Sequence, residues 1–183
     1  AQHYLDPLQY LLCKDETSPV LIDYKGPRQH PEAVGRFDRI TLTYDDGTTV
    51  ALDGDETLKD EPLLRGANGL CVYPKAKEGK TLRLKDANGW WPEEKVLATL
   101  AGLPKPAPQQ TDFIDSCRNR KTFALNESNG FRSCTMFNLA IVAERLGRGF
   151  RFDPVALRAV DDQAADRFLY QGMRAPWKKE MWG

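Results

Sequence analysis

The 183-residue chain has no block of like charges and no long apolar run. Its 26 Lys and Arg residues balance 26 Asp and Glu residues, so the formal net charge is zero. Proteins that bind nucleic acid or anionic membranes concentrate positive charge, and this sequence shows no such footprint. No stretch approaches the roughly 18 apolar residues of a membrane-spanning helix. The sequence therefore predicts a globular domain that binds neither nucleic acid nor a membrane.

The cysteines are too scattered for a metal site. Cys13, Cys71, Cys117 and Cys134 lie far apart, and no pair has the C-x-x-C spacing of zinc ligands. We therefore expect no metal, and we interpret the cysteines as separate buried thiols in a reducing compartment. This favours the cytoplasm, although four cysteines are also compatible with export.

Nucleotide-binding motifs are missing as well. The sequence contains no G-x-G-x-x-G, no P-loop and no G-x-S-x-G. It therefore predicts that the chain carries no dinucleotide site of its own.

The sequence does contain clear strand signals in its first half. In "RFDRITLTYDDGTTVALDG", two alternating runs meet at Asp46-Gly47, a typical hairpin turn pair. Further strands are expected in "SPVLIDYKG", "GANGLCVYP" and "GKTLRLKDANG". The strands in the middle of the chain would form one antiparallel, meander-like sheet.

Helix signals stand at the start of the chain and throughout its second half. The expected helices are "DPLQYLLCKDE" with Asp6 as N-cap and Pro7 at the first helical position, "WPEEKVLATLAG", "TDFIDSCRNRK" with Thr111 as N-cap, a buried helix from Gly130 to Leu146 ended by Gly147, and "DDQAADRFLY". This order predicts an α+β fold in a single domain over residues 1–183. We expect a largely antiparallel open-faced sheet with helices packed on one face.

Five short elements in the second half resemble the C-terminal half of one enzyme family. They are Asn119-Arg120, Gly130 to Ser133 ("GFRS"), Arg145 to Arg148 ("RLGR"), Phe152 to Pro154 ("FDP") and Arg174 to Trp177 ("RAPW"). Their types and order are similar to those of the glucose–fructose oxidoreductase / inositol dehydrogenase / MocA (Gfo/Idh/MocA) family. The resemblance covers about Thr111 to Trp177 well and the middle sheet only in pattern.

The resemblance implies a substrate-binding and oligomerisation half of an oxidoreductase. Such enzymes pass hydride from a sugar or polyol hydroxyl to NAD or NADP, which a preceding N-terminal Rossmann domain binds. The family's catalytic His falls on His3, and its partnering Asp would lie just before Ala1. We therefore expect that Ala1 is not the natural start of the protein and that an N-terminal part precedes it. The open sheet face is expected to bind another copy and form a homo-oligomer.

Tyr4, His30, Trp90 and Arg132 are candidate substrate contacts. Tyr4 adjoins His3, although a tyrosine on a helix more often serves packing. His30 lies in a Pro-flanked loop, where binding residues concentrate, and is otherwise a solvated side chain. Trp90 could stack on a sugar or plug a core edge. Arg132 could bind substrate or donate to a structural carbonyl or carboxylate, and Phe131 stands where many relatives have His.

Two other functions stay open at this point. Some relatives oxidise a sugar transiently with tightly held NAD and so cleave a glycosidic bond. Alternatively, the chain is a stand-alone binding or scaffold module without catalysis. The sequence upstream of Ala1 distinguishes an enzyme from such a module.

Overall fold

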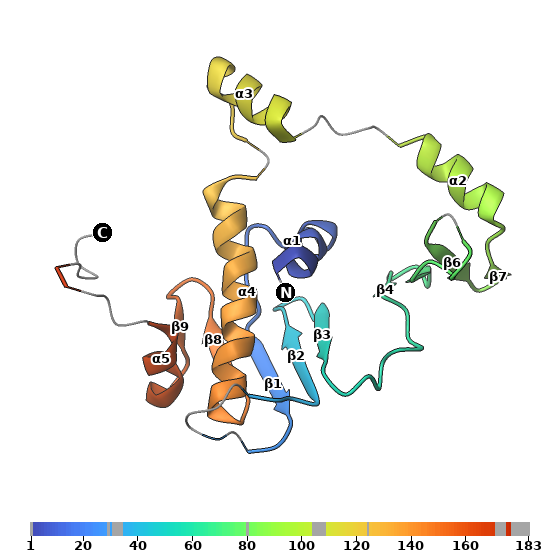
Figure 1. The fold of residues 1–183 in the computed structure, drawn as a ribbon. Coiled ribbons are helices and arrows are strands. Elements are labelled where there is room, and N and C mark those ends of the chain that lie inside the picture. The colour runs from blue at the N-terminus through green and yellow to red at the C-terminus, as the bar shows by residue number, and fades with distance from the viewer. Residues whose placement is uncertain are drawn as a thin grey trace. The chain divides into compact units, whose positions relative to one another are not determined.

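A computed structural model describes residues 2–28, 30, 35–79, 81–103, 109–123, 125–170 and 175–176. The chain divides into two compact units (Figure 1). Unit 1 comprises residues 1–56 and 122–183, and unit 2 comprises residues 57–121. Each unit is considered by itself.

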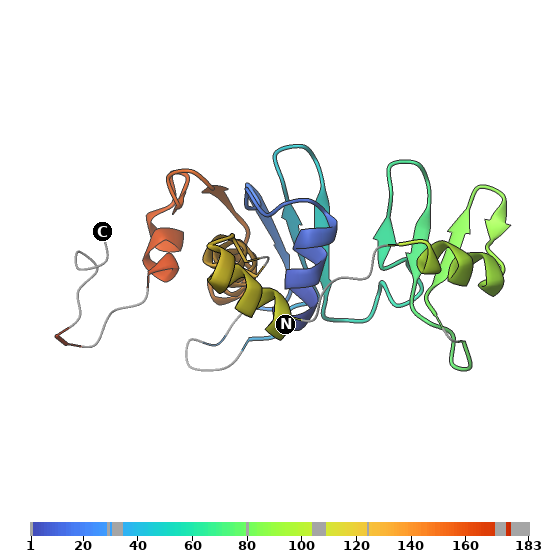
Figure 2. The ribbon, with the colours of Figure 1, turned by 90° about the horizontal axis from the view of Figure 1, so that it is seen from above.

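Unit 1 is a five-stranded antiparallel sheet with helices against one face. Its sheet has the order β3-β2-β1-β8-β9. The long helix α4 packs against β1 and β2, and α1 and α5 pack against α4 (Figures 1 and 2). The elements are α1 (Gln2–Leu11), β1 (Leu21–Lys25), β2 (Arg39–Thr43), β3 (Thr49–Asp53), α4 (Glu127–Leu146), β8 (Phe150–Asp153), β9 (Arg158–Ala159) and α5 (Gln163–Leu169).

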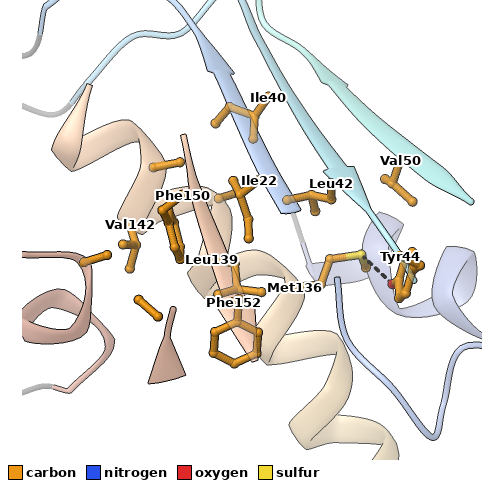
Figure 3. Packing of buried hydrophobic residues seen from close by; sticks show 14 of the residues in the cluster. Ile22, Ile40, Leu42, Tyr44, Val50, Met136, Leu139, Val142, Phe150 and Phe152 are labelled. Atoms are coloured by element: carbon orange, nitrogen blue, oxygen red, sulfur yellow. Dashed lines mark hydrogen bonds between the residues drawn. The ribbon is translucent and has the colours of Figure 1, made fainter. Parts of the chain in front are cut away.

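The core of unit 1 lies between the sheet and α4. Ile22, Ile40 and Leu42 alternate with exposed or half-buried residues along their strands, so one face of each strand is buried. Met136 and Leu139 of α4 are fully buried against this face (Figure 3). The predicted α+β fold with one covered and one open sheet face is confirmed.

Unit 2 is a second, smaller antiparallel sheet with two helices. Its sheet has the order β4-β5-β6-β7. The elements are β4 (Leu64–Arg65), β5 (Cys71–Tyr73), β6 (Arg83–Asp86), β7 (Gly89–Trp90), α2 (Glu93–Ala101) and α3 (Gln109–Asn119). Strands β5 and β6 lie within the stretches where the sequence predicts strands, whereas β4 and β7 were not predicted.

The prediction of one meander through the middle of the chain is wrong. The hairpin β2–β3 and the strands β4–β7 belong to different sheets. The second edge of β1 pairs with β8 instead, with Ile22 opposite Phe150. An edge strand with a buried face is stabilised by any strand that completes its backbone hydrogen bonds, however distant in sequence. Such a long-range partner leaves no local signal.

The β2–β3 hairpin is confirmed, but its turn differs from the expected pair. The Gly47 N–H donates to the Tyr44 carbonyl at 3.1 Å, and the Tyr44 N–H donates to the Thr48 carbonyl at 2.9 Å. The loop is therefore Asp45-Asp46-Gly47, and Gly47 takes the left-handed conformation with φ 83°. Three-residue hairpin loops of this kind place Gly at the third position.

Helix α4 ends as predicted and begins earlier. Gly147 follows it with φ 64°, the left-handed conformation that commonly ends a helix. At the other end the Asn126 side chain accepts hydrogen bonds from the N–H groups of Ser128 and Asn129. The helix therefore starts at Glu127 and not at Gly130. A glycine inside the first turn carries little cost when a strong cap precedes it.

The predicted starts of α1 and α3 are wrong. Helix α1 runs from Gln2, so Asp6 is not its cap and Pro7 lies inside it. Pro7 lies in the second turn, where proline forgoes one backbone hydrogen bond and is less favourable than at the first helical position. Helix α3 runs from Gln109, which places Thr111 inside the helix. In both cases the residue expected as the N-cap lies within about one turn after the observed start of the helix.

The cysteines are separate, as predicted, but three of them are not buried. Cys71 is buried, whereas Cys13, Cys117 and Cys134 are exposed, and no disulfide joins them. Cys134 illustrates the reason, since α4 buries only one side and Cys134 lies on its exposed side together with Phe131 and Asn138. No helix among the residues that the structure describes is long and apolar enough to cross a membrane.

Candidate functional site

Buried polar side chains of unit 1 hold α1 in place. Gln9 on α1 and Tyr44 after β2 are each 1% exposed. The Tyr44 hydroxyl donates to Gln9 Oε1 at 3.1 Å and lies 3.5 Å from Met136 Sδ of α4. Gln9 Nε2 donates to the backbone carbonyl of Lys14 at 2.9 Å. These contacts fix α1, the helix that carries His3, against the hairpin and α4.

An ion pair completes this arrangement. Lys14 Nζ lies 2.5 Å from Asp46 Oδ2 in the hairpin turn and 5.2 Å from the Tyr44 ring centroid. We call Gln9, Lys14, Tyr44, Asp46 and Met136 the α1 anchor. It joins α1 to the sheet through groups with complementary charge and hydrogen-bonding capacity.

The electrostatics of the α1 anchor suit a structural role. The hydrogen bond from Lys14, followed by that from the Thr48 N–H, lowers the pKa of Asp46 to about 2. Burial is the largest cause that raises the pKa of Tyr44 to about 12, and the charges of Asp15 and Asp46 add to it. At neutral pH Asp46 is therefore ionised and Tyr44 keeps its proton. Neither group is poised to exchange a proton.

Arg132 ties α4 to two other segments of unit 1. Its Nη1 lies 3.4 Å from both Ser18 Oγ, just before β1, and the Pro154 carbonyl, just after β8. These contacts are long for hydrogen bonds. Within the described part of the chain, Nε and Nη2 make no hydrogen bond. The guanidinium therefore combines a structural tether with donor capacity for a further group.

The structure places the other candidates of unit 1 away from Arg132 or leaves them undetermined. Arg132 reaches the start of β1, whereas the exposed His30 follows the end of β1. In sequence, the two are therefore connected to opposite ends of this strand. His3 and Tyr4 belong to the first turn of α1, and their side chains lie outside the described residues.

Trp90 belongs to unit 2 and lies on an exposed surface. Its side chain is 50% exposed, and its ring centroid lies 4.9 Å from that of Tyr73. The neighbouring Trp91 is half-buried instead, and its Nε1 donates to Asp86 Oδ2 at 2.7 Å. Two adjacent tryptophans therefore differ, since Trp91 packs within the unit and Trp90 faces outward.

A hollow of about 380 Å³ next to α5 is lined by Arg158 and several acidic side chains, three of which accept hydrogen bonds from within unit 1. Asp162 accepts two hydrogen bonds from Arg148, at 2.6 and 2.9 Å, and this interaction is the largest cause that lowers its pKa to about 2. Asp166 accepts from the Ala159 N–H at 2.6 Å. Asp153 accepts from two backbone N–H groups of the following turn, which lower its pKa. These carboxylates therefore stabilise the β9–α5 region rather than act as general acids.

Two groups of residues escaped the sequence analysis. The Gln9–Tyr44 hydrogen bond joins residues 35 positions apart, and no local sequence pattern indicates such a contact. The sequence did contain a pattern that could have identified Arg83 and Lys85, which lie over the Trp90 ring. In "LRLKD" the basic residues alternate, and alternation on a strand places both on one face.

The described residues offer no cradle for a dinucleotide. All strand pairs in both sheets are antiparallel. Dinucleotides bind instead at the carboxyl ends of parallel strands, beside a Gly-rich turn that opens a helix. Among the described residues there is also no group of three His, Cys, Asp or Glu side chains that could hold a metal ion.

Comparison with known proteins identifies the family. No curated protein and no solved structure matches the chain significantly. A family model described as "Oxidoreductase family, C-terminal alpha/beta domain" matches residues 1–179, nearly the whole chain. The match spans both units, including the middle sheet that the sequence motifs covered only in pattern. The chain thus belongs to the Gfo/Idh/MocA oxidoreductase family, of which it is a C-terminal alpha/beta domain.

Proposed function

We propose that residues 1–183 form the substrate-binding and oligomerisation half of an NAD(P)-dependent oxidoreductase that acts on a sugar or polyol hydroxyl. The observation that carries this proposal is the family match over residues 1–179. Both sheets are antiparallel, whereas a Rossmann domain is built on parallel strands, and the proposal therefore assigns the cofactor to an N-terminal Rossmann domain.

In this proposal His3 accepts the proton of the substrate hydroxyl. A neutral imidazole suits this step near neutral pH, since the ordinary pKa of histidine is about 6.5. The α1 anchor serves as the positioning device, because it fixes the helix that carries His3 through buried contacts. The domain that holds the nucleotide provides the hydride acceptor.

Each remaining candidate is a separate proposal for a substrate contact, since Arg132 and Trp90 belong to different units. Arg132 is suited to a substrate oxygen, because its Nη1 is tethered to Ser18 and Pro154 while its other nitrogens retain donor capacity. Tyr4 adjoins His3 in sequence, and His30 offers an exposed ring at the other end of β1. Trp90 offers an exposed aromatic face for a sugar ring.

The open face of the five-stranded sheet is the proposed contact with another copy. Along β1, Leu21, Asp23 and Lys25 are exposed while Ile22 between them is buried. The face opposite α4 therefore presents a row of side chains with mixed apolar and charged character. Such a surface can pair with its own copy about a two-fold axis, because charges of both signs are available.

The test uses the full-length protein that contains this chain. Reduction of NAD or NADP is measured with a panel of sugars and polyols. We expect His3→Asn to lower kcat by about 10²–10⁴-fold, the usual contribution of a general base. Arg132→Gln should mainly raise KM, and the control Cys134→Ser, an exposed residue of α4, should change neither constant.

Absence of nucleotide reduction with every sugar, together with no heat stabilisation by NAD or NADP, would contradict the proposal, since a bound cofactor raises stability. Cleavage of a glycoside without net NADH would instead indicate the glycosidase reaction. A monodisperse monomer in a size measurement would remove the oligomerisation role.

A further inference from the structure

One face of the unit 2 sheet carries basic and aromatic side chains together. The register pairs Arg65 with Cys71, Cys71 with Lys85 and Lys85 with Trp90, and in the next row Tyr73 with Arg83. Directly paired residues project to the same side of a sheet. We call Arg65, Tyr73, Arg83, Lys85 and Trp90 the basic-aromatic face. Cys71 is buried beneath them.

The side chains of the basic-aromatic face surround the Trp90 ring. Arg83 Cζ lies 4.9 Å from the Trp90 ring centroid and 5.8 Å from that of Tyr73. Lys85 Nζ lies 5.5 Å from the Trp90 centroid. Within this group Trp90 is still 50% exposed. The arrangement holds two cations over an indole ring that stays half exposed.

Helix α2 lies on the opposite side of this sheet. Trp91 follows Trp90 and therefore projects to the other face. There it lines a hollow together with Glu93 and Val96 of α2, and Arg83 of β6 borders the same hollow. Lys95 Nζ lies 3.7 Å from the Trp91 ring centroid. The basic-aromatic face is thus the side of the unit 2 sheet that α2 leaves uncovered.

The charge of this region is strongly biased. Residues 57–121 contain twelve Lys and Arg and eight Asp and Glu, a formal charge of +4, in a chain whose total is zero. Residues 65–85, which include most of the sheet, contain six Lys and Arg and only one Glu. A local positive potential of this kind selects an anionic ligand.

We propose that the basic-aromatic face binds an anionic sugar that carries a carboxylate, a uronate unit of an acidic oligosaccharide. The proposal rests on the proposed function in taking the ligand to be a sugar. The C–H face of the sugar ring stacks on Trp90, and the carboxylate pairs with Arg83 and Lys85.

The spacing of the groups favours a uronate over a nucleotide. A uronate has its carboxylate on a carbon attached directly to the ring, so the cations that bind it must lie close to the stacking aromatic. In a nucleotide the ribose separates the phosphate from the base, and phosphate-binding cations lie further from the stacking ring. Arg83 and Lys85 lie within 5.5 Å of the Trp90 centroid, as a uronate requires.

The test measures binding of oligogalacturonate to the 183-residue chain by isothermal titration calorimetry. A neutral galactose oligomer of the same length and an oligo(dT) of similar charge serve as comparison ligands. We expect oligogalacturonate to bind most tightly, with an affinity that falls as salt is added. Trp90→Ala and Lys85→Gln should each weaken binding by about tenfold.

The matched control is Lys95→Gln, which removes the same charge from the α2 side of the unit. It should leave binding unchanged. Trp90→Phe, which retains an aromatic face, should lose less affinity than Trp90→Ala and so separates stacking from any effect on folding. Equal binding of the neutral oligomer, tighter binding of oligo(dT), or an equal loss in Lys95→Gln and Lys85→Gln would overturn the proposal.

Failure of this inference is distinguishable from failure of the proposed function. Sugar oxidation by the full-length protein without oligogalacturonate binding would remove the uronate site alone. Oligogalacturonate binding without any sugar oxidation would retain the site and remove the oxidoreductase proposal.

Discussion

The two units of this chain have opposite charge and very different cores. Residues 57–121 carry a formal charge of +4, so the rest of the chain, with fourteen basic and eighteen acidic residues, carries −4. Unit 1 has a continuous cluster of buried apolar side chains between its sheet and α4. In unit 2 the described hydrophobic residues that are buried are Cys71 and Val96. The balanced composition of the whole chain conceals this division.

The difference indicates different sources of stability. Burial of apolar surface stabilises a domain by about 25 cal/mol per Å², and most of that surface is in unit 1. Large apolar side chains of unit 2, including Leu97, Leu100, Phe113 and Ile114, stay exposed. Unit 1 has exposed apolar side chains too, so the difference lies in the buried core and not in the surface. Unit 1 is therefore the unit that apolar burial stabilises more.

The largest expected effect is a core mutation in unit 1. Leu139 is fully buried on α4, and Leu139→Ala should lower the free energy of unfolding by about 3 kcal/mol through lost burial and a residual cavity. Leu97→Ala, on the exposed side of α2 in unit 2, should cost less than about 0.5 kcal/mol. Urea unfolding followed by circular dichroism measures both. Similar losses would contradict the difference between the two cores.

Removal of one hydrogen-bond donor should also lower the free energy of unfolding more in unit 1 than in unit 2. Tyr44→Phe leaves Gln9 Oε1 buried without its donor and should cost about 1–3 kcal/mol. Trp91→Phe removes the donor to Asp86 in unit 2, where water can replace it, and should cost about 1 kcal/mol or less. The pKa of Asp86 should rise in that variant, since the Trp91 hydrogen bond is the largest cause that lowers it.

The raised pKa of Tyr44 predicts that the protein loses stability at alkaline pH, which gives its pH profile of stability an alkaline limb. Its pKa is raised from 10.0 to about 12 in the folded protein, so the folded state holds the proton more tightly than the unfolded state. The resulting stabilisation is complete below pH 10 and is lost as the pH rises towards 12. Tyr44→Phe should lack this part of the pH dependence. An unchanged alkaline limb in the variant would show that other groups cause it.

The sequence predicts the local parts of this fold and misses the long-range ones. The hairpin at Gly47 and the end of α4 at Gly147 are confirmed, because a glycine in the left-handed conformation leaves a local signal. The pairing of β1 with β8 and the division into two sheets depend on segments far apart in the chain. Pattern alone cannot choose between partners that satisfy the same edge equally well.

The candidate site shows the same limit. Arg132 was identified with two possible roles, and the structure adds its tether to Ser18 and Pro154. The Gln9–Tyr44 contact of the α1 anchor brings together a helix and a hairpin that no motif connects. For His3 the role stays a prediction, because it comes from resemblance and its side chain lies outside the described residues.

The start of α4 offers a smaller effect that again separates the units. The Asn126 side chain accepts two backbone hydrogen bonds there, whereas Pro92 before α2 provides no side-chain cap. Asn126→Ala should lower the free energy of unfolding by about 1 kcal/mol, and Asn126→Asp should restore it. Thermal unfolding measures the change. An equal loss in both variants would show that Asn126 acts through its other contact, the donation from Nδ2 to the Phe123 carbonyl.

The smallest expected effect is the Arg148–Asp162 ion pair, because Arg148 is half exposed and water screens the pair. The pKa of Asp162 is lowered from 3.8 to about 2, so its stabilisation is present above pH 4 and is lost as the pH falls towards 2. Asp162→Asn keeps an N-cap for α5 but loses the ion pair. The difference in the free energy of unfolding between Asp162→Asn and the natural protein should therefore shrink as the pH falls through that range. Asp161→Asn makes the same change one position away, where the described residues form no ion pair, and should show a constant difference. If this difference for Asp162→Asn stays the same at acidic pH, Asp162 stabilises the fold only as the N-cap of α5.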